Sequence, residues 1–233
     1  MFLQMRYIIT SLLLVFICVS CNSTAIITQD KSSTISYLAL GDSYTIGESV
    51  AENQRWPVQL VQKLKEEGYP IQSPKIIAKT GWRTDELLEA MNNEQGEEKY
   101  DLVSVLIGVN NQYQARDFKQ LQEELEIILQ QAIKKSKQGA DGVFVLSIPD
   151  YSVTPFAKGR KVDEIAREIK SYNEQCKLMS NNYGIKYFYI TDISKKASEN
   201  LDLVATDGLH PSAEMYTQWV EKIYTNVKQM LNE

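Results

Sequence analysis

The stretch ISYLALGDSYTIG, residues 35–47, decides the fold class that this sequence predicts. Its first half, residues 35–40, is a short apolar run with branched and aromatic side chains, and it ends at the turn residues Gly41 and Asp42. That pattern is typical of a strand buried on both faces. Four more runs of this kind follow, at residues 75–78, 102–107, 143–148 and 185–190. The sequence therefore predicts five buried strands.

Segments with helical spacing of apolar residues alternate with these runs. They cover residues 57–67, 85–93, 117–138 and 162–182, and a fifth begins at Pro211, a residue suited to the first turn of a helix, and runs towards Leu231. Such alternation requires right-handed crossovers, which place helices on both faces of a parallel sheet. We expect one α/β domain, a three-layer α/β/α flavodoxin-like domain with a five-stranded parallel sheet.

The composition limits the functions that are open to this chain. Of its 233 residues, 43% are hydrophobic and 24% are charged, which fits a globular domain with a full core. A net charge of −5 argues against a nucleic-acid partner. One histidine and three cysteines give neither a disulfide framework nor a recognisable set of metal ligands, and there is no P-loop or GxGxxG pattern. We expect no metal and no cofactor, and the sequence indicates no oligomeric state.

The N-terminus has the features of an export signal. Residues 1–20 carry one positive charge, at Arg6, followed by an apolar run at residues 8–19 that is short for a membrane span. Cys21 follows the small residue Ser20, which resembles a bacterial lipoprotein signal in which Cys21 is lipidated. Cys18 stands where such signals usually carry an aliphatic residue, so an ordinary secretory peptide cut nearby is the alternative.

We therefore expect an exported protein, a membrane-anchored bacterial lipoprotein of the cell envelope. Residues 1–20 would be the signal peptide and residues 21–34 a polar tether. The only membrane contact would be the lipid on Cys21.

Small, polar or aromatic residues follow each predicted strand. The five stretches are GDSYTIG (41–47), KTGWRT (79–84), GVNNQY (108–113), PDYSVTP (149–155) and, beyond a further loop, TDGLHPS (206–212). Ligands of open parallel sheets bind outside the carboxyl ends of the strands, so we expect these stretches to meet at one rim. Each has a structural explanation when taken alone, because Asp and Ser cap helices and Gly permits unusual backbone angles.

Together, the residue types at this rim form a complete set for acyl transfer. Ser43 lies at a tight strand-to-helix turn and could act as the nucleophile. His210 could accept its proton, and Asp207, three residues earlier, could orient the imidazole. The backbone N–H groups of Ser43 and Gly81 and the side-chain amide of Asn110 are candidate donors for an oxyanion.

Four blocks carry a family resemblance: GDSYT, TGWRT, GVNN and DGLHP, in that order. They resemble the blocks of the SGNH hydrolases, also called GDSL-type lipases and esterases, and the resemblance spans residues 35–233. It implies a catalytic triad of Ser43, Asp207 and His210, with an oxyanion hole made by Ser43, Gly81 and Asn110. The family hydrolyses lipids, acetylated sugars, thioesters and small aryl esters.

Three positions depart from the family pattern. Tyr44 replaces the Leu of the GDSL block, Asn111 stands where many members have Asp, and Lys79 stands where many have Asn. The Asn111 change could alter hydrogen bonding in its loop, and the Lys79 change puts support of the second block in doubt.

Four aromatic residues are candidates for substrate binding: Tyr44, Trp82, Tyr113 and Tyr151. They could form a wall for a sugar face, an aryl group or a short acyl group, or they could pack the loops against each other. No long apolar insertion that could form a lipase lid is evident. We expect a serine esterase for short-acyl, carbohydrate or small-molecule esters that works through an acyl-enzyme at Ser43. The alternatives are a lipase or thioesterase of the same family and an envelope lipoprotein that binds a ligand without turnover.

Overall fold

A single parallel sheet organises the computed structural model, which describes residues 34–94 and 96–232. The strands are β1 (Tyr37–Gly41), β2 (Lys75–Ala78), β3 (Leu102–Leu106), β4 (Val143–Leu146) and β5 (Lys186–Phe188), in the spatial order β2-β1-β3-β4-β5. All four pairings are parallel, and Leu40 lies opposite both Ile77 and Val105. This order is that of the flavodoxin-like doubly wound fold, so the predicted fold class is confirmed.

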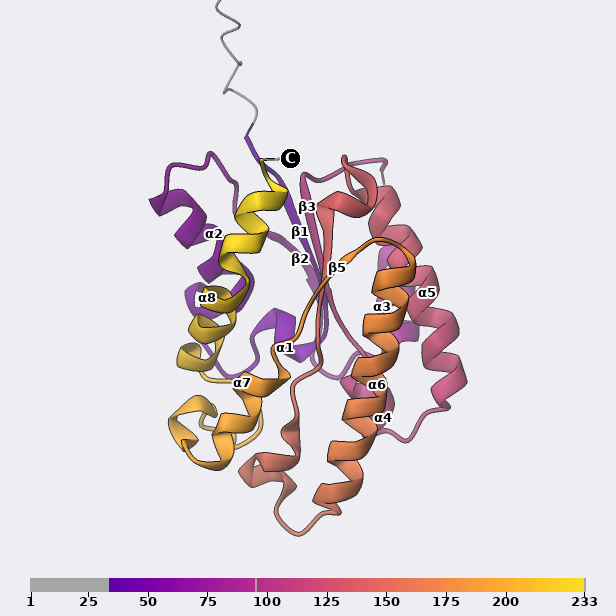
Figure 1. The fold of residues 1–233 in the computed structure, drawn as a ribbon, viewed down its shortest axis with the longest axis vertical. Coiled ribbons are helices and arrows are strands. Elements are labelled where there is room, and N and C mark those ends of the chain that lie inside the picture. Colours follow the sequence, from indigo (N-terminus) through magenta and orange to yellow (C-terminus); the bar gives the residue numbers. More distant parts are fainter. Residues whose placement is uncertain (1–33, 95, 233) are drawn as a thin grey trace, which may run out of the picture. The chain divides into compact units, whose positions relative to one another are not determined.

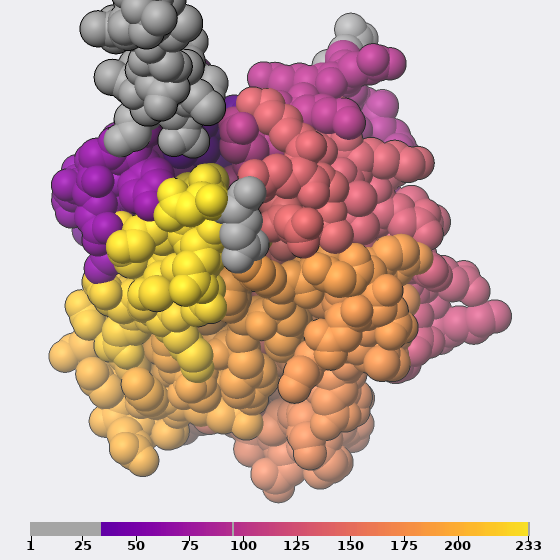
Figure 2. Space-filling model, turned by 45° about the horizontal axis from the view of Figure 1, so that its top comes forward, coloured from indigo at the N-terminus to yellow at the C-terminus, as the bar shows by residue number. Residues whose placement is uncertain are grey.

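Long helices cover both faces of the sheet (Figure 1). The helices α2 (Trp56–Glu66) and α8 (Ala213–Met230) lie on one face, and α3 (Thr84–Asn93), α5 (Phe118–Lys135) and α6 (Val162–Asn182) lie on the other. Figure 2, which brings the upper end of Figure 1 forward, shows the yellow residues of α8 beside the purple residues of the α2 region. The protein has the three layers that alternating strands and helices predict.

Each face of the sheet has its own core. On one face, the side chains of α2 and α8, including the fully buried Trp56 and Trp219, pack against Phe144 of β4. On the other face, apolar residues of α3, α5 and α6 pack against Val103 and Val105 of β3. All five residues of β3 are buried, which accounts for its mostly apolar sequence, LVSVL.

The short helices of the described residues could not be predicted from apolar periodicity, because they span less than two turns. Three are α-helical, α1 (Ser43–Ile46), α4 (Val109–Tyr113) and α7 (Thr191–Lys195), and they follow β1, β3 and β5. The others are 3₁₀ turns: η1 (Glu52–Gln54), η2 (Gly139–Gly142), η3 (Tyr151–Val153), η4 (Pro155–Ala157), η5 (Lys196–Ser198) and η6 (Leu201–Leu203). Most of these helices lie in the loops after the carboxyl ends of the strands.

Several predicted boundaries differ from the observed ones by a few residues. Pro211, expected in the first turn of the last helix, instead forms a bridge with Val204, and Ser212 caps α8 by accepting the Met215 N–H. Strand β5 is shorter than residues 185–190, because the chain turns into α7. The sharp turn is held by the Ser147 hydroxyl, which accepts the Ile190 N–H at 2.8 Å.

The predicted signal peptide, Cys21 and most of the tether fall at residues 1–33, outside the described residues. Within the described part of the chain, no helix is both long and apolar enough to cross a membrane. The described chain begins next to the amino ends of the strands, at the same end of the sheet as the C-terminus (Figure 1). The loops that carry the predicted site residues follow the opposite, carboxyl ends.

Candidate active site

The turn between β1 and α1 presents Ser43. Asp42 caps α1, since its Oδ1 accepts the Tyr44 N–H at 3.0 Å. Gly41 is required by close packing, because a Cβ there would lie 2.4 Å from the Leu106 carbonyl oxygen. Ser43 is thus the first residue of a helix, where backbone N–H groups have no intrahelical partner and can bind an anion. Its side chain is almost fully enclosed, with 4% of the residue exposed.

A second turn, just before α8, joins Asp207 to His210. Oδ1 of Asp207 accepts the backbone N–H groups of Leu209 and His210 at 2.9 and 3.0 Å. Oδ2 is 2.6 Å from Nδ1 of the His210 ring. Gly208 makes the turn possible with a φ of +75°. The three-residue spacing seen in the sequence therefore corresponds to a local turn that fixes the carboxylate against the imidazole.

The electrostatics of this pair suit a base and its partner. Partial burial would raise the pKa of Asp207, but hydrogen bonds from Ser49, His210 and two backbone N–H groups outweigh it and hold that pKa well below its ordinary value. A carboxylate only accepts, so Nδ1 of His210 donates and Nε2 is left to take a proton. The Tyr44 ring packs edge-on against the imidazole, with ring centroids 5.8 Å apart.

The candidate oxyanion donors come from the loops after β2 and β3. Gly81 has a φ of +87° in a turn closed by the Lys79 carbonyl, which accepts the Trp82 N–H at 3.2 Å. Asn110 lies in α4, and its Nδ2 donates to the Trp82 carbonyl oxygen at 2.9 Å. One amide hydrogen of Asn110 is thus held by the neighbouring loop, which fixes the plane of the amide and leaves its second hydrogen for a ligand.

Asn111, which departs from the usual Asp, braces the same two loops. Its Oδ1 accepts the Thr84 N–H at 3.1 Å, and its Nδ2 donates to the Thr84 hydroxyl at 2.6 Å. Both residues are buried. An aspartate could make the first of these bonds, but it could not donate the second. The substitution therefore changes how the loop is bonded to the start of α3 and leaves Asn110 in place.

These loops enclose a cavity of about 170 Å³. It is lined by Ser43, Tyr44, Thr80, Gly81, Val109, Asn110, Tyr113, Tyr151, Phe156, Leu209 and His210. The structure thus brings together at one cavity the nucleophile, the base and both additional oxyanion donors predicted from the sequence. Asp207 does not line the cavity and contacts His210 from behind.

The hydrogen bonds of the described residues do not include one between the Ser43 hydroxyl and the His210 ring. The position of the His210 ring is nevertheless restricted, because Asp207 holds its Nδ1 and the Tyr44 ring packs edge-on against it. In enzymes without substrate, catalytic hydrogen bonds are often long and tighten in the substrate complex. The arrangement is therefore compatible with proton transfer once an ester occupies the cavity.

Three of the four predicted substrate-binding aromatics line the cavity, and one does not. Tyr44 and Tyr151 are buried, whereas Tyr113 is 46% exposed and lies at the rim. Trp82 is not among the residues that line the cavity: its half-buried ring packs against the apolar core on the side of α3 and α5, and its carbonyl oxygen accepts from Asn110. Phe156, which the sequence reasoning missed, takes a place in the aromatic wall, 5.9 Å from the Tyr113 ring.

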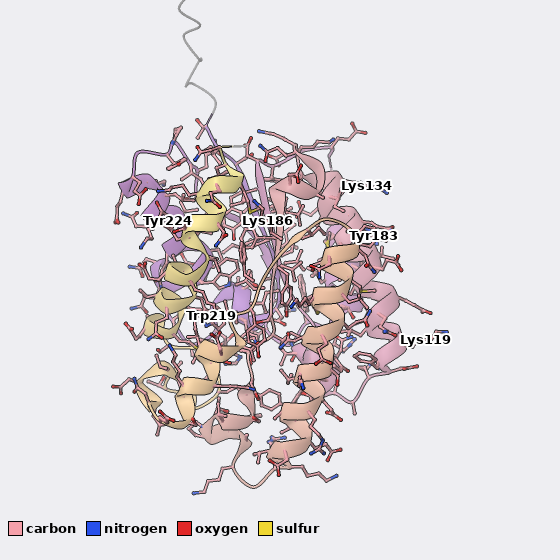
Figure 3. All side chains as sticks on the ribbon, viewed as in Figure 1. Lys119, Lys134, Tyr183, Lys186, Trp219 and Tyr224 are labelled. Carbon is pink, nitrogen blue, oxygen red and sulfur yellow. The ribbon has the colours of Figure 1, made fainter. Side chains whose placement is uncertain are left out.

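The other missed lining residues are Thr80, Val109 and Leu209. Each adjoins a residue that was singled out, so inspecting whole blocks rather than single positions would have found them. A further support lies behind the site, where Trp219 of α8, labelled in Figure 3, packs edge-on against Tyr44 with ring centroids 6.5 Å apart. No group of three or more potential ligands that could hold a metal ion occurs among the described residues.

Comparisons with known proteins agree with this arrangement. The model of the GDSL-like lipase/acylhydrolase family matches residues 39–218. No curated protein matches the sequence. Among solved structures, TesA has 20% identity and a TM-score of 0.63, covering 84% of this chain and 99% of its own.

Two similar structures are esterases by description. The psychrotrophic esterase EstA from Pseudoalteromonas sp., inhibited by monoethylphosphonate, has 18% identity and a TM-score of 0.56, covering 85% of this chain and 99% of its own. A variant of Axe2, an acetyl xylan esterase from Geobacillus stearothermophilus, has 18% identity and a TM-score of 0.59, covering 83% and 96%. At these identities the likeness supports the fold.

Proposed function

This chain belongs to the GDSL-like lipase/acylhydrolase family, and from that premise we propose that it is a serine esterase acting on short-acyl esters of carbohydrates or small molecules. Ester hydrolysis follows from the family. The finer proposal rests on one observation: a single small cavity is lined by Ser43, Gly81, Asn110 and His210, with Asp207 bonded to the histidine. A protein that only bound a ligand would not need a base together with a carboxylate that orients it.

The mechanism assigns a role to each of these groups. The Ser43 oxygen attacks the ester carbonyl carbon while Nε2 of His210 takes the hydroxyl proton. The carbonyl oxygen becomes an oxyanion, which is stabilised by the N–H groups of Ser43 and Gly81 and by the Asn110 amide. His210 then gives its proton to the departing alcohol, and the acyl group remains on Ser43. Water, activated by the same histidine, releases the acid and restores the serine.

The size and lining of the cavity support a short acyl group. About 170 Å³ is close to the volume that holds a benzene-sized molecule, and a drug-sized ligand needs ~300 Å³ or more. Tyr113 is exposed at the rim, where an aromatic ring can pack against the face of a sugar or an aryl alcohol. The acyl group would then occupy the enclosed part and the alcohol the open part.

Hydrolysis of p-nitrophenyl esters tests the activity. We expect the acetate and butyrate to be hydrolysed with far higher kcat/KM than the decanoate. Ser43→Ala should lower turnover by about 10⁶, whereas Ser171→Ala, at an exposed serine on α6, should match the wild type. Preference for the decanoate, or for acyl thioesters over esters, would instead favour a lipase or a thioesterase.

Covalent labelling separates catalysis from binding alone. A fluorophosphonate should modify Ser43 in the wild type and leave the Ser43→Ala variant unlabelled. Equal hydrolysis by wild type and Ser43→Ala, together with no labelling of folded protein, would refute the esterase mechanism and favour a ligand-binding protein.

We also propose that Cys21 is lipidated and tethers the domain to the cell envelope. Support comes from the apolar run before Cys21, the small residue Ser20 and the polar residues that follow. The described chain begins at the end of the sheet opposite the active-site loops (Figure 1), so a tether there leaves the cavity open. Mass spectrometry of the native N-terminus should find an acylated Cys21. An unacylated start at another residue would refute the anchor.

A further inference from the structure

Ser49 adopts a backbone conformation that serine rarely adopts. Its φ is +66°, in the left-handed region, and it is one of two described residues other than glycine with a positive φ; the other is Ala115. Such a conformation strains the backbone of a non-glycine residue, and it persists where surrounding structure or function requires it. Glycine would fill this position without strain, so the serine side chain itself needs an explanation.

The Ser49 hydroxyl donates a hydrogen bond to Oδ2 of Asp207 at 2.6 Å. This is the same carboxylate oxygen that holds Nδ1 of His210, also at 2.6 Å. The two residues are 158 positions apart, and the contact joins the loop after the nucleophile to the turn that carries the base. The short distance is that of a charge-assisted hydrogen bond to an ionised carboxylate.

The loop that carries Ser49 is itself fixed at several points. Its amide groups bond back to α1 and its C-cap: the Glu48 N–H donates to the Ser43 carbonyl at 3.0 Å, and the Val50 N–H donates to the carbonyl of the C-cap residue Gly47 at 3.3 Å. The Glu48 carboxylate also accepts the hydroxyl of Thr80, the residue before Gly81. Ser49 therefore projects from a braced segment, and its hydroxyl is held in one place.

Asp207 needs such a contact because it is not enclosed. Its side chain is 30% exposed, and among the described residues its other oxygen is held only by backbone N–H groups of its own turn. Without Ser49, the one remaining partner of Oδ2 in this part of the chain would be the imidazole that it has to orient. Water would then compete for that oxygen, and the carboxylate could rotate with the ring.

We propose that Ser49 is a positioning residue of the active site, which fixes the Asp207 carboxylate so that it holds His210 in the catalytic orientation. The proposal deepens the serine-esterase function and rests on it. The left-handed backbone at Ser49 accompanies the hydrogen bond from its hydroxyl to the carboxylate, which explains why this strained position holds a serine and not a glycine.

Two effects follow from removing the hydroxyl. The first is a loss of orientation, which should lower kcat about tenfold, because small misplacements of catalytic groups have large effects on rate. The second is electrostatic: the hydrogen bond from Ser49 is one of those that hold the pKa of Asp207 below its ordinary value. Without it the Asp207 carboxylate is protonated more readily, so the acidic limb of kcat/KM should move to higher pH.

Ser49→Gly is the decisive variant, because it removes the hydroxyl and relieves the backbone strain at once. We expect a Tm equal to or above that of the wild type, a kcat about tenfold lower and an acidic limb at higher pH. Ala115→Gly is the matched control: it relieves the same kind of strain outside the triad and should leave both kcat and the pH profile unchanged. If Ser49→Gly keeps the wild-type kcat and pH profile, Ser49 serves only the loop and the proposal is overturned.

The solitary histidine provides a second readout that does not depend on turnover. His210 is the only histidine in the chain, so the imidazole signals in an NMR spectrum of untagged protein report this ring alone. Ser49→Gly should shift the signal of the Nδ1 hydrogen, because Oδ2 of Asp207 is no longer fixed, and it should have no effect in an Asp207→Asn background. An unchanged signal would overturn the proposal. A shifted signal in a protein without esterase activity would refute the proposed function and leave the Ser49–Asp207–His210 coupling established.

The neighbouring titratable groups do not account for a change in the pH profile of kcat/KM. Burial raises the phenol pKa values of Tyr44 and Tyr216 well above 10, so both stay neutral across that profile. Burial raises the pKa of Asp42 to about 7, and repeating the comparison in an Asp42→Asn background removes that group. The shift caused by Ser49→Gly should be the same in both backgrounds, and a shift seen only with Asp42 present would count against the proposal.

Discussion

Asp42 makes the stability of the fold depend on pH in a direction that can be worked out from its surroundings. The residue is fully buried beside the nucleophile. Its Oδ1 accepts the Tyr44 N–H, but its Oδ2 is buried without a hydrogen-bond partner among the described residues. Burial raises its pKa to about 7, against the opposing effect of backbone hydrogen bonds. The protonated carboxyl is therefore the form that this site favours.

The expected effect of Asp42→Asn follows from that shift. The pKa of Asp42 is about 7 in the folded state and close to 3.8 in the unfolded state, so the folded state holds the proton more tightly. The stability that this provides is fully present below pH 4 and is lost as pH rises through 7. A difference of about three pKa units at 1.36 kcal/mol each corresponds to roughly 4 kcal/mol between the two ends. The asparagine keeps the Oδ1 acceptor and cannot ionise.

Urea denaturation at pH 4, 5.5, 7 and 8.5 measures this difference. The free energy of unfolding of Asp42→Asn relative to wild type should increase across the series and reach a plateau above pH 8. Comparing the two proteins at each pH cancels the contribution of Asp207, whose lowered pKa acts in the opposite sense at acidic pH. Asp202→Asn, at an exposed aspartate, should show no such trend. A difference between wild type and Asp42→Asn that stays constant with pH would show that Asp42 is ionised or solvated, and would refute the reasoning.

Three further predictions concern the site and its loops. Asn110→Ala should lower kcat by about 10² to 10³ with little change in KM, because the amide acts mainly on the transition state. An unchanged kcat in steady-state kinetics would exclude Asn110 from the oxyanion hole. Gly108→Ala should reduce the free energy of unfolding, measured by urea denaturation, by roughly 1–3 kcal/mol, because the φ of Gly108 is +119° and a Cβ would lie 3.1 and 3.2 Å from two buried methyl groups. Equal stability of the two proteins would contradict that geometry. Tyr113→Ala should raise KM for aryl esters, whereas Trp82→Phe should leave it unchanged. The reverse result would show that Trp82, and not Tyr113, contacts the substrate.

The fold could be predicted because its signals are local and repeated. The apolar run before Gly41 and the helical spacing of residues 162–182 each reveal an element over a length that fixes its period. Helix α6 was predicted over the bounds at which it occurs, Val162–Asn182. Helices α1 and α4 carry no such signal, because four or five residues do not complete a period, and their existence depends on caps and on packing against the sheet.

For the site as well, contacts within one turn of the chain could be predicted from the sequence, and contacts that depend on packing could not. Asp207 and His210 are joined by a turn of three residues, so their spacing in the sequence already contained their geometry. The position of the Trp82 ring could not be predicted in this way, because the sequence shows which loop a side chain belongs to, while packing decides whether it faces the cavity or the core.

The contact of Ser49 with Asp207 lies beyond sequence reasoning for a stronger reason. It spans 158 residues and depends on a left-handed serine, a conformation that residue type argues against. Local preference and observed structure thus disagree at a residue bonded to the Asp207 carboxylate, and natural sequences tend to break local rules where function requires it. That disagreement became visible only once the backbone angle and the hydrogen bond were known together, and it is the physical reason to look for function at Ser49.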